Sequence, residues 1–291
     1  MLYLDASRLR AFRTCPELYR RRYMENIVPD KVAIHLEFGT AIHKMHELFW
    51  CGAGYDQAYQ SAHDHLTAID QTGLTPMEKE RLEGMWDMLP ECVAGYYELH
   101  DGSVKPQLLE AEFPFPTSSV PTSPSGVILC GRIDRYNDGC LTDVKTVSAV
   151  GRNWKSELET SLVRDVQLPL YDYYLFCNNY IVQQILVEVL IKPYRKAEPR
   201  WEVLDLTAPI VAGRERFKQQ LDFQLREMVH YHQNYMGMKP WPMSSTACVT
   251  KYGVCDYASA CIYGDIPRIM ASFKKREEHL KCIARKRLKD L

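Results

Sequence analysis

Two short apolar runs carry charged residues that packing alone would not place there. In GRIDRYNDGCLTDVKT, residues 131–146, these residues are Asp134, Asp143 and Lys145. Asp143 and Lys145 are two positions apart, so in a β-strand their side chains point to the same face. Carboxylates bind hard cations such as Mg²⁺ or Mn²⁺, and a bound cation lowers the pKa of water. With a lysine to offset charge on a phosphoryl oxygen, these residues predict a site that hydrolyses phosphodiesters. The alternative is a surface hairpin whose charge pairs are solvated.

The elements that must position these residues follow from the pattern around them. Residues 108–115, 126–136 and 140–147 have strand composition, and the turn residues 137–139, Asn-Asp-Gly, separate the last two runs. Residues 116–126, rich in Pro, Ser and Thr, predict a loop. A helix is expected over 167–178, a strand over 181–191 and a helix over 207–236. This order predicts an α/β fold with a mixed central sheet flanked by helices.

The first hundred residues have helical periodicity. Ser7 is a candidate N-cap, Pro16 is suited to the first turn of a second helix, and Thr75 is a candidate N-cap before Pro76. We therefore divide the chain into a helical region, residues 1–106, a core, residues 107–206, and C-terminal helices with a cysteine cluster, residues 207–291. The three parts are expected to form one structural unit.

Composition places the chain among ordinary globular proteins. It has 291 residues, of which 46% are hydrophobic and 25% charged. No apolar run reaches the roughly 18 to 20 residues of a membrane span, and the N-terminus lacks the layout of a signal peptide. We expect a cytoplasmic protein without a membrane partner. Residues 274–291 hold eight Lys or Arg and three Asp or Glu, which suits either a polyanion contact or a solvated helix end.

Four of the ten cysteines are spaced differently from the rest. Cys248, Cys255 and Cys261 lie close together near the C-terminus, and Cys15 precedes a proline near the N-terminus. Reducing compartments keep thiols free, so metal binding is a more natural use for them than disulfides. Four thiolates suit either a [4Fe-4S] cluster or tetrahedral Zn²⁺, and spacing alone does not separate the two.

Taken together, these residues resemble the PD-(D/E)XK nucleases, specifically the RecB-type branch that includes AddB-like and CRISPR-associated iron-sulfur exonucleases. The resemblance runs from about Ser7 to Cys261. It rests on GRIDR with Asp134, DVKT with Asp143 and Lys145, QLPLY with Gln167 and Tyr171, and GTAIH with His43. It implies a restriction-endonuclease-like core with a helical N-terminal region and a C-terminal iron-sulfur segment.

The resemblance also assigns roles. Asp134, Asp143, the backbone carbonyl of Val144 and His43 are implied to bind Mg²⁺ or Mn²⁺, and Lys145 is implied to position water or stabilise charge. Gln167 and Tyr171, four residues apart, share one helix face and could orient Lys145 or a phosphate. Glu112 is a candidate supporting acid on the first strand. Glu110 shares its face in a regular strand, and the sequence does not choose between them.

For the cysteines, the resemblance favours a [4Fe-4S] cluster bound by Cys15, Cys248, Cys255 and Cys261. The five-residue gap between Cys255 and Cys261 matches the family, whereas the six residues between Cys248 and Cys255 depart from it.

The expected function is a metal-dependent deoxyribonuclease that degrades single-stranded DNA from its ends in recombination, repair or replication. The alternatives are a non-cutting DNA-binding subunit of a recombination or CRISPR adaptation complex, and a zinc-stapled scaffold. No GxxxxGK[ST] motif is present, so any unwinding would come from a helicase partner.

Overall fold

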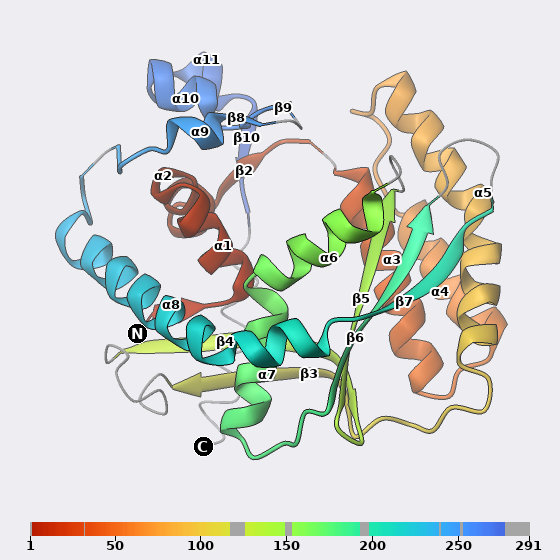
Figure 1. Cartoon of the computed structure of the whole chain (residues 1–291). Coiled ribbons are helices and arrows are strands. Elements are labelled where there is room, and N and C mark those ends of the chain that lie inside the picture. The colour runs from red at the N-terminus through yellow and green to blue at the C-terminus, as the bar shows by residue number, and fades with distance from the viewer. Residues whose placement is uncertain are drawn as a thin grey trace, which may run out of the picture.

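The computed structural model describes residues 2–31, 33–116, 126–148, 153–192, 198–238, 240–250 and 253–276. Two sequence predictions lie wholly or largely outside these residues: the loop, of which 117–125 are not described, and the basic tail, of which 277–291 are not described. Within the described residues, a 6-stranded sheet is flanked by helices on both faces (Figure 1). The strands of this sheet are β1 (Leu2–Leu4), β3 (Leu108–Pro116), β4 (Val127–Asn137), β5 (Cys140–Ser148), β6 (Gln184–Lys192) and β7 (Arg200–Asp205).

The sheet is mixed, as the sequence predicted. Its order is β1-β4-β5-β6-β7, with β3 paired to β4. β3, β4 and β5 run antiparallel in turn, β5 and β6 are parallel, and β7 is antiparallel to β6. Asp138 and Gly139, with φ of 44° and 82°, form the turn between β4 and β5. Positive φ at both central residues is the geometry of a tight type I′ hairpin, which fixes the register of the two strands.

One face of the sheet is covered by α3 (Ile34–Trp50), α4 (Tyr55–Thr67) and α5 (Pro76–Leu99). Their buried side chains form a core with Val144 of β5 and Leu190 of β6. α5 begins with the predicted cap: Thr75 and Glu78 form a reciprocal capping box. α3 begins at Ile34 and continues through Gly39 without interruption. α3 carries His43, which lies close to Glu110 of β3 and Asp134 of β4.

The opposite face is covered by α1 (Ala6–Thr14), α6 (Trp154–Arg164), α7 (Gln167–Cys177) and α8 (Thr207–Asn234). Their core includes Phe12, Leu170 and Leu225. The predicted N-cap of α1, Ser7, is wrong. Asp5 is the cap, and its carboxylate accepts a 2.7 Å hydrogen bond from the backbone N–H of Arg8, because the helix begins one residue before Ser7.

The two ends of the described chain meet beside the sheet (Figure 1). Near the N-terminus lie α2 (Pro16–Tyr19), the π-helix η1 (Arg20–Met24) and β2 (Ile27–Pro29). The C-terminal segment contains α9 (Ser245–Cys248), β8 (Val249–Thr250), β9 (Gly253–Val254), α10 (Ala258–Tyr263), α11 (Pro267–Met270) and β10 (Phe273–Lys275). β10 pairs antiparallel with β2. No helix among the described residues combines the length and the apolar character needed to cross a membrane.

A buried charge network adds to this junction. Glu17 is fully buried, accepts hydrogen bonds from Arg20 and Arg21, and accepts another of 2.8 Å from the backbone N–H of Trp241. Arg21 also pairs with Asp265. Burial alone would raise the pKa of Glu17, but these donors hold it below its usual value of 4.5. The ionised carboxylate therefore joins α2 to the C-terminal segment.

Candidate active site

The two edges of β4 are paired differently, and this creates an opening in the sheet. β3 pairs with β4 along one edge from Ile128 to Tyr136. On the other edge, β1 pairs with residues 127–129 and β5 pairs only with residues 135–137. Residues 130–134 of that edge have no strand partner among the described residues. β4 and β5 therefore diverge (Figure 1), and side chains from both can converge in the space between them.

Asp134 lies at the point of divergence. Asp134 is 6% exposed, and its Oδ2 accepts a 2.8 Å hydrogen bond from the backbone N–H of Val144. The last ladder pair of the hairpin is Arg135 with Thr142. Two residues further along β5, the aspartate side chain accepts the bond from Val144 that a carbonyl of β4 would accept in a continued ladder. The same contact satisfies the N–H of Val144 and fixes the carboxylate.

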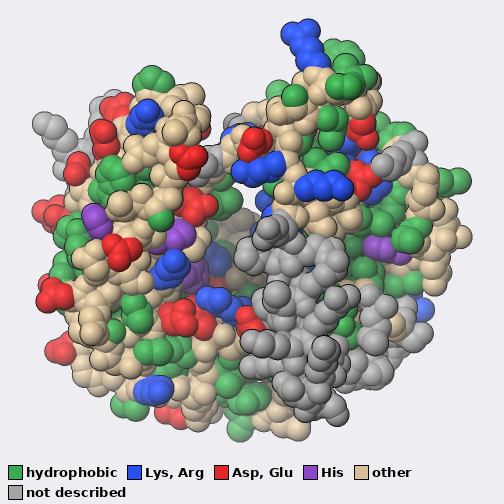
Figure 2. All heavy atoms as spheres, turned by 180° about the vertical axis from the view of Figure 1, so that it is seen from behind, with side chains coloured by type: hydrophobic (Ala, Val, Ile, Leu, Met, Phe, Trp, Pro, Cys, Tyr) green, Lys and Arg blue, Asp and Glu red, His purple; other side chains and the backbone are tan. Residues whose placement is uncertain are grey.

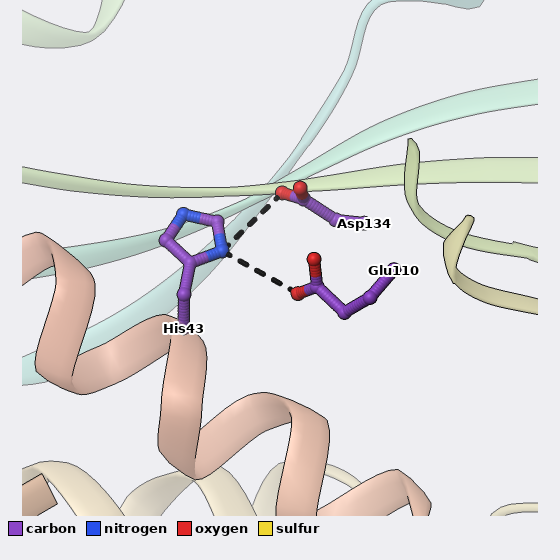
Figure 3. Close-up of side chains that lie close together, drawn as sticks. All are labelled: His43, Glu110 and Asp134. Atoms are coloured by element: carbon purple, nitrogen blue, oxygen red, sulfur yellow. Dashed lines mark ion pairs between the residues drawn. The ribbon is translucent and has the colours of Figure 1, made fainter. Parts of the chain in front are cut away.

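His43, Glu110 and Asp134 form a compact group of metal-ligand type (Figure 3). Their ligand atoms all lie within 4.8 Å of one another. Nδ1 of His43 is 3.8 Å from Oε1 of Glu110 and 3.8 Å from Oδ2 of Asp134. Burial lowers the pKa of His43, but the two carboxylates outweigh it and raise the pKa overall. One imidazole nitrogen and two carboxylates are a suitable donor set for a divalent cation such as Mn²⁺.

Glu110, and not Glu112, is the acid that lies with His43 and Asp134. Its carboxylate is 7% exposed, and Oε1 is buried without a hydrogen-bond partner, as expected for an atom reserved for a cation. Glu110 has φ of 47°, so β3 is irregular at this residue and the alternation of faces used to compare the two glutamates fails there. Of the two glutamates that the sequence left open, Glu110 is therefore the one that lies beside His43 and Asp134.

Two further residues surround Glu110 and were missed in the sequence. His46, fully buried one turn after His43, places Nδ1 3.5 Å from Oε1 of Glu110. Arg132 of β4 donates a hydrogen bond from Nε to Oε2. Burial alone would raise the pKa of Glu110, but His43, His46 and Arg132 lower it strongly, so the carboxylate is ionised. The spacing of His43 and His46, i to i+3 on one helix, was the available sequence signal.

Asp143 and Lys145 point to the same side of β5, as expected. Nζ of Lys145 is 2.6 Å from Oδ2 of Asp143, and Gln167 donates a 3.0 Å hydrogen bond to Oδ1. Burial raises the pKa of Asp143 to about 6, with a contribution from nearby Asp134 and opposition from Lys145. Burial opposes the charge of Lys145, but Asp143 and Asp134 raise its pKa. A lysine charge is thus fixed beside two carboxylates.

Gln167 and Tyr171 reach this site from the first turns of α7. Tyr171 is 6% exposed and packs edge-on against Phe113. Its ring fills the space beside Gly131, where an added Cβ would come within 2.9 Å of the ring. Burial raises the pKa of Tyr171, and the carboxylates of Asp143 and Asp134 add to this rise. Gln167 therefore contacts Asp143, whereas Tyr171 is buried and packs against β4 at Gly131.

The four cysteines of the predicted cluster lie together away from this site. Cys15, Cys248, Cys255 and Cys261 line one small cavity with the apolar residues Leu18, Met243, Ala247, Tyr257 and Ala258. The backbone N–H of Cys255 donates a 2.8 Å hydrogen bond to the carbonyl of Cys248. Burial raises the pKa of Cys255 and of Cys261. Thiols from both ends of the described chain are therefore brought to one place despite the unusual Cys248 spacing.

The fold and the site define a class of protein: an α/β protein in which a His, Glu and Asp group able to hold a cation and a fixed lysine charge lie where two strands diverge. The model of the PD-(D/E)XK nuclease superfamily matches residues 4–262, and the chain belongs to this superfamily. It is a nuclease by this membership. The restriction-endonuclease-like core expected from the sequence is confirmed.

A solved structure supports the same fold. The chain is similar to a protein from Eubacterium rectale described as a "Putative exonuclease", with a TM-score of 0.52 and 12% sequence identity. The similarity covers 97% of this chain and 93% of that chain. At this identity the likeness concerns the fold. No curated protein matches the sequence.

Proposed function

We propose that this protein is a metal-dependent deoxyribonuclease of the RecB-type branch that degrades single-stranded DNA from its ends. The observation that carries the proposal is the juxtaposition of Asp134 with His43 and Glu110 on one side and with Asp143 and Lys145 on the other. A cation site and a lysine beside it are the parts that phosphodiester hydrolysis requires. Recombination, repair or replication, with a helicase partner supplying single strands, is the proposed setting.

Among the residues of the site, His43, Glu110 and Asp134 would hold Mg²⁺ or Mn²⁺, with Asp143 and the carbonyl of Val144 as further ligands implied by the family. A cation bound there would acidify water and neutralise charge on the phosphoryl group. Lys145 places a positive charge where the scissile phosphate gains negative charge. Gln167 holds the orientation of Asp143, and Val144 holds that of Asp134.

We further propose that Cys15, Cys248, Cys255 and Cys261 bind a [4Fe-4S] cluster that joins the ends of the chain. The shared cavity and its apolar lining support this assignment. Thiolate ligation closes a loop of more than two hundred residues, which stabilises a fold in principle. Iron and sulfide analysis of anaerobically purified protein tests it. Stoichiometric zinc without iron would show the alternative centre.

None of the nine described cysteines forms a disulfide, which is consistent with a reducing, cytoplasmic location that we also propose. The chain is proposed to act as one structural unit made of the regions 1–106, 107–206 and 207–291.

The test of the nuclease assignment is degradation of linear and circular single-stranded DNA with Mg²⁺ or Mn²⁺, using wild-type protein, Lys145→Ala and Lys155→Ala. Lys155 is a matched control because its side chain is 51% exposed and pairs with Glu202 on the surface. We expect the wild type and Lys155→Ala to degrade the linear strand only, and Lys145→Ala to degrade neither.

Cleavage of the circular DNA would show that the protein is an endonuclease and contradict the proposed exonuclease activity. Equal inactivity of all three proteins, with binding retained, would favour the second candidate, a non-cutting DNA-binding subunit. Loss of binding at low salt in all three would exclude a DNA function altogether, since phosphate contacts are strongest there.

A further inference from the structure

Three arginines from three different segments surround one tyrosine ring where the chain ends meet. The guanidinium carbons of Arg8, Arg22 and Arg276 lie 5.3, 5.8 and 5.5 Å from the centroid of the Tyr23 ring. Arg8 belongs to α1, Arg22 and Tyr23 belong to η1, and Arg276 follows β10. Three positive charges are therefore concentrated around a single aromatic side chain.

These arginines have no acidic partner among the residues that the structure describes. None of the three forms an ion pair there, and the Nε atom of each is buried without a hydrogen-bond partner. The two arginines preceding Arg22 differ: Arg20 and Arg21 are buried against Glu17. In YRRRY, residues 19–23, Arg20 and Arg21 therefore stabilise the fold by pairing with Glu17, whereas Arg22 makes no such pair among the described residues.

The local backbone favours a binding role for the cluster of Arg8, Arg22 and Arg276. η1 is a π-helix, a rare conformation that occurs frequently at functional sites. Tyr23 stacks on the buried Tyr19, which fixes its ring, and the backbone N–H of Arg276 donates a 2.7 Å hydrogen bond to the carbonyl of Asn26. Tyr23 and the three arginines are all half-buried, so a ligand can reach guanidinium groups that are already ordered.

The chemistry of the cluster selects its ligand. A guanidinium that lies over a ring still presents its N–H groups at its edge, and these match the oxygens of a phosphate group. Three neighbouring cations repel each other until an anion lies between them. Figure 2 shows Lys and Arg side chains along the rim of the central hollow that separates the α3–α5 lobe from the rest of this face.

We propose that Arg8, Arg22 and Arg276 bind a phosphate group of the DNA strand whose scissile phosphate lies in the active site. The inference rests on the proposed function and assigns it a second, non-catalytic contact. The phosphate is either a terminal 5′-phosphate or an internal phosphate of the strand, and both present the same oxygens. In either case the cluster anchors the strand and takes no part in the chemical step.

The test is binding of a fluorescent single-stranded oligonucleotide without divalent metal, over a range of salt concentrations, with 5′-phosphate and 5′-hydroxyl forms. The proteins are the wild type, Arg22→Gln/Arg276→Gln and Arg22→Lys/Arg276→Lys. The control is Arg200→Gln/Arg226→Gln, whose two side chains are 59% and 56% exposed on the surface. Each lost phosphate contact lowers the slope of log K against log salt by about 0.7 for single strands.

We expect the glutamine pair to lower the slope by about 1.4 and the lysine pair and the control to keep it. If the slope of the glutamine pair falls only with the 5′-phosphate oligonucleotide, the bound group is a terminal phosphate. If it falls equally with both oligonucleotides, the bound group is an internal phosphate. An unchanged slope in the glutamine pair, or the same fall in the control, overturns the assignment. Poor folding of the glutamine pair shows in its melting temperature. The affinity of the lysine pair at a fixed salt concentration then decides, because lysine keeps the charge but loses the planar fork: affinity falls if the guanidinium groups bind a phosphate, and wild-type affinity overturns the assignment.

Cleavage assayed in parallel separates this proposal from the proposed function. A wild type that cuts DNA while the glutamine pair keeps its slope refutes the phosphate site alone. A wild type that binds through these arginines without cutting refutes the nuclease alone. A wild type that binds no oligonucleotide refutes both.

Discussion

The carboxylate of Asp134 accepts a 2.8 Å hydrogen bond from the backbone N–H of Val144. This bond replaces a ladder bond that would otherwise join β4 to β5. Asp134 therefore has two tasks, as part of the group with His43 and Glu110 and as the residue that satisfies a buried N–H group of the neighbouring strand. The two tasks can be separated by substitution, because only one of them needs a charge.

Asp134→Asn is expected to keep the fold and lose activity, whereas Asp134→Ala is expected to lose both activity and stability. Asparagine retains an oxygen for Val144 but not the charge that holds a cation. Losing several kcal/mol of metal-derived stabilisation corresponds to about 10²- to 10³-fold in rate. Leaving the N–H of Val144 unsatisfied costs about 1–3 kcal/mol more in the alanine variant. Urea unfolding and cleavage of labelled DNA measure the two effects. Equal unfolding free energies would contradict the structural task of Asp134.

Glu110→Gln is expected to weaken Mn²⁺ binding by at least about 10-fold, and Glu112→Gln is expected to leave it near the wild-type value. The reason is that Glu110, with its buried and ionised carboxylate, lies beside His43 and Asp134. Calorimetric titration of Mn²⁺ gives the comparison. If Glu112→Gln were the weaker binder, Glu112 would be the supporting acid and the irregular strand would have no role in the site.

Gln167→Ala is expected to lower the maximal cleavage rate without changing DNA affinity. The side-chain amide holds Oδ1 of Asp143, and a hydrogen bond to a charged group contributes about 1.5–3 kcal/mol, or roughly 10- to 100-fold in rate. Gln219→Ala, on the exposed surface of α8, is the control. Steady-state rates and metal-free binding separate the effects. A raised KM with unchanged kcat would indicate a substrate contact in place of a positioning one.

Glu17 makes stability depend on pH in the acidic range. Its pKa is lowered in the folded protein, so its stabilising contribution is present above its ordinary value of 4.5 and is lost as pH falls through the folded pKa. Glu17→Gln leaves Arg20 and Arg21 buried without their carboxylate and is expected to cost about 3–5 kcal/mol at neutral pH.

Urea unfolding from neutral pH down to about pH 3 measures this difference, which is expected to shrink below pH 4.5. Glu215→Gln serves as the control, since the Glu215 side chain is 77% exposed. A difference between wild type and Glu17→Gln that stayed constant with pH would show that the carboxylate is not ionised in the folded protein.

Much of the fold could be predicted from the sequence because the local residue patterns agree with the elements that form. The turn at residues 137–139, the strand composition of β4 and β5 and the cap at Thr75 each have a short-range cause that the sequence displays. β1 and β7 were not predicted. A strand of three residues has no period to detect, and β1 exists because β4 offers it a free edge.

The site was readable to the extent that it follows regular geometry. Asp143 and Lys145 share a face because strands alternate, and Gln167 follows from helical spacing. Glu110 did not follow, because its positive φ breaks the alternation, and no local residue requires that conformation. The conformation of Glu110 follows from the tertiary structure, because its side chain interacts with His43, His46 and Arg132, which are distant in the sequence.

The divergence of β4 and β5 has a further consequence. The sheet is continuous between its two halves only through the three residue pairs nearest the turn. Asp134 belongs to one half, and Asp143 and Lys145 belong to the other, so among the described residues their mutual alignment depends on one short hairpin and on the hydrogen bond from Val144 to Asp134. Inserting a single residue into that turn would displace Asp134 of β4 relative to Asp143 and Lys145 of β5. This nuclease should therefore tolerate insertions poorly at this turn, although it lies at the end of a hairpin.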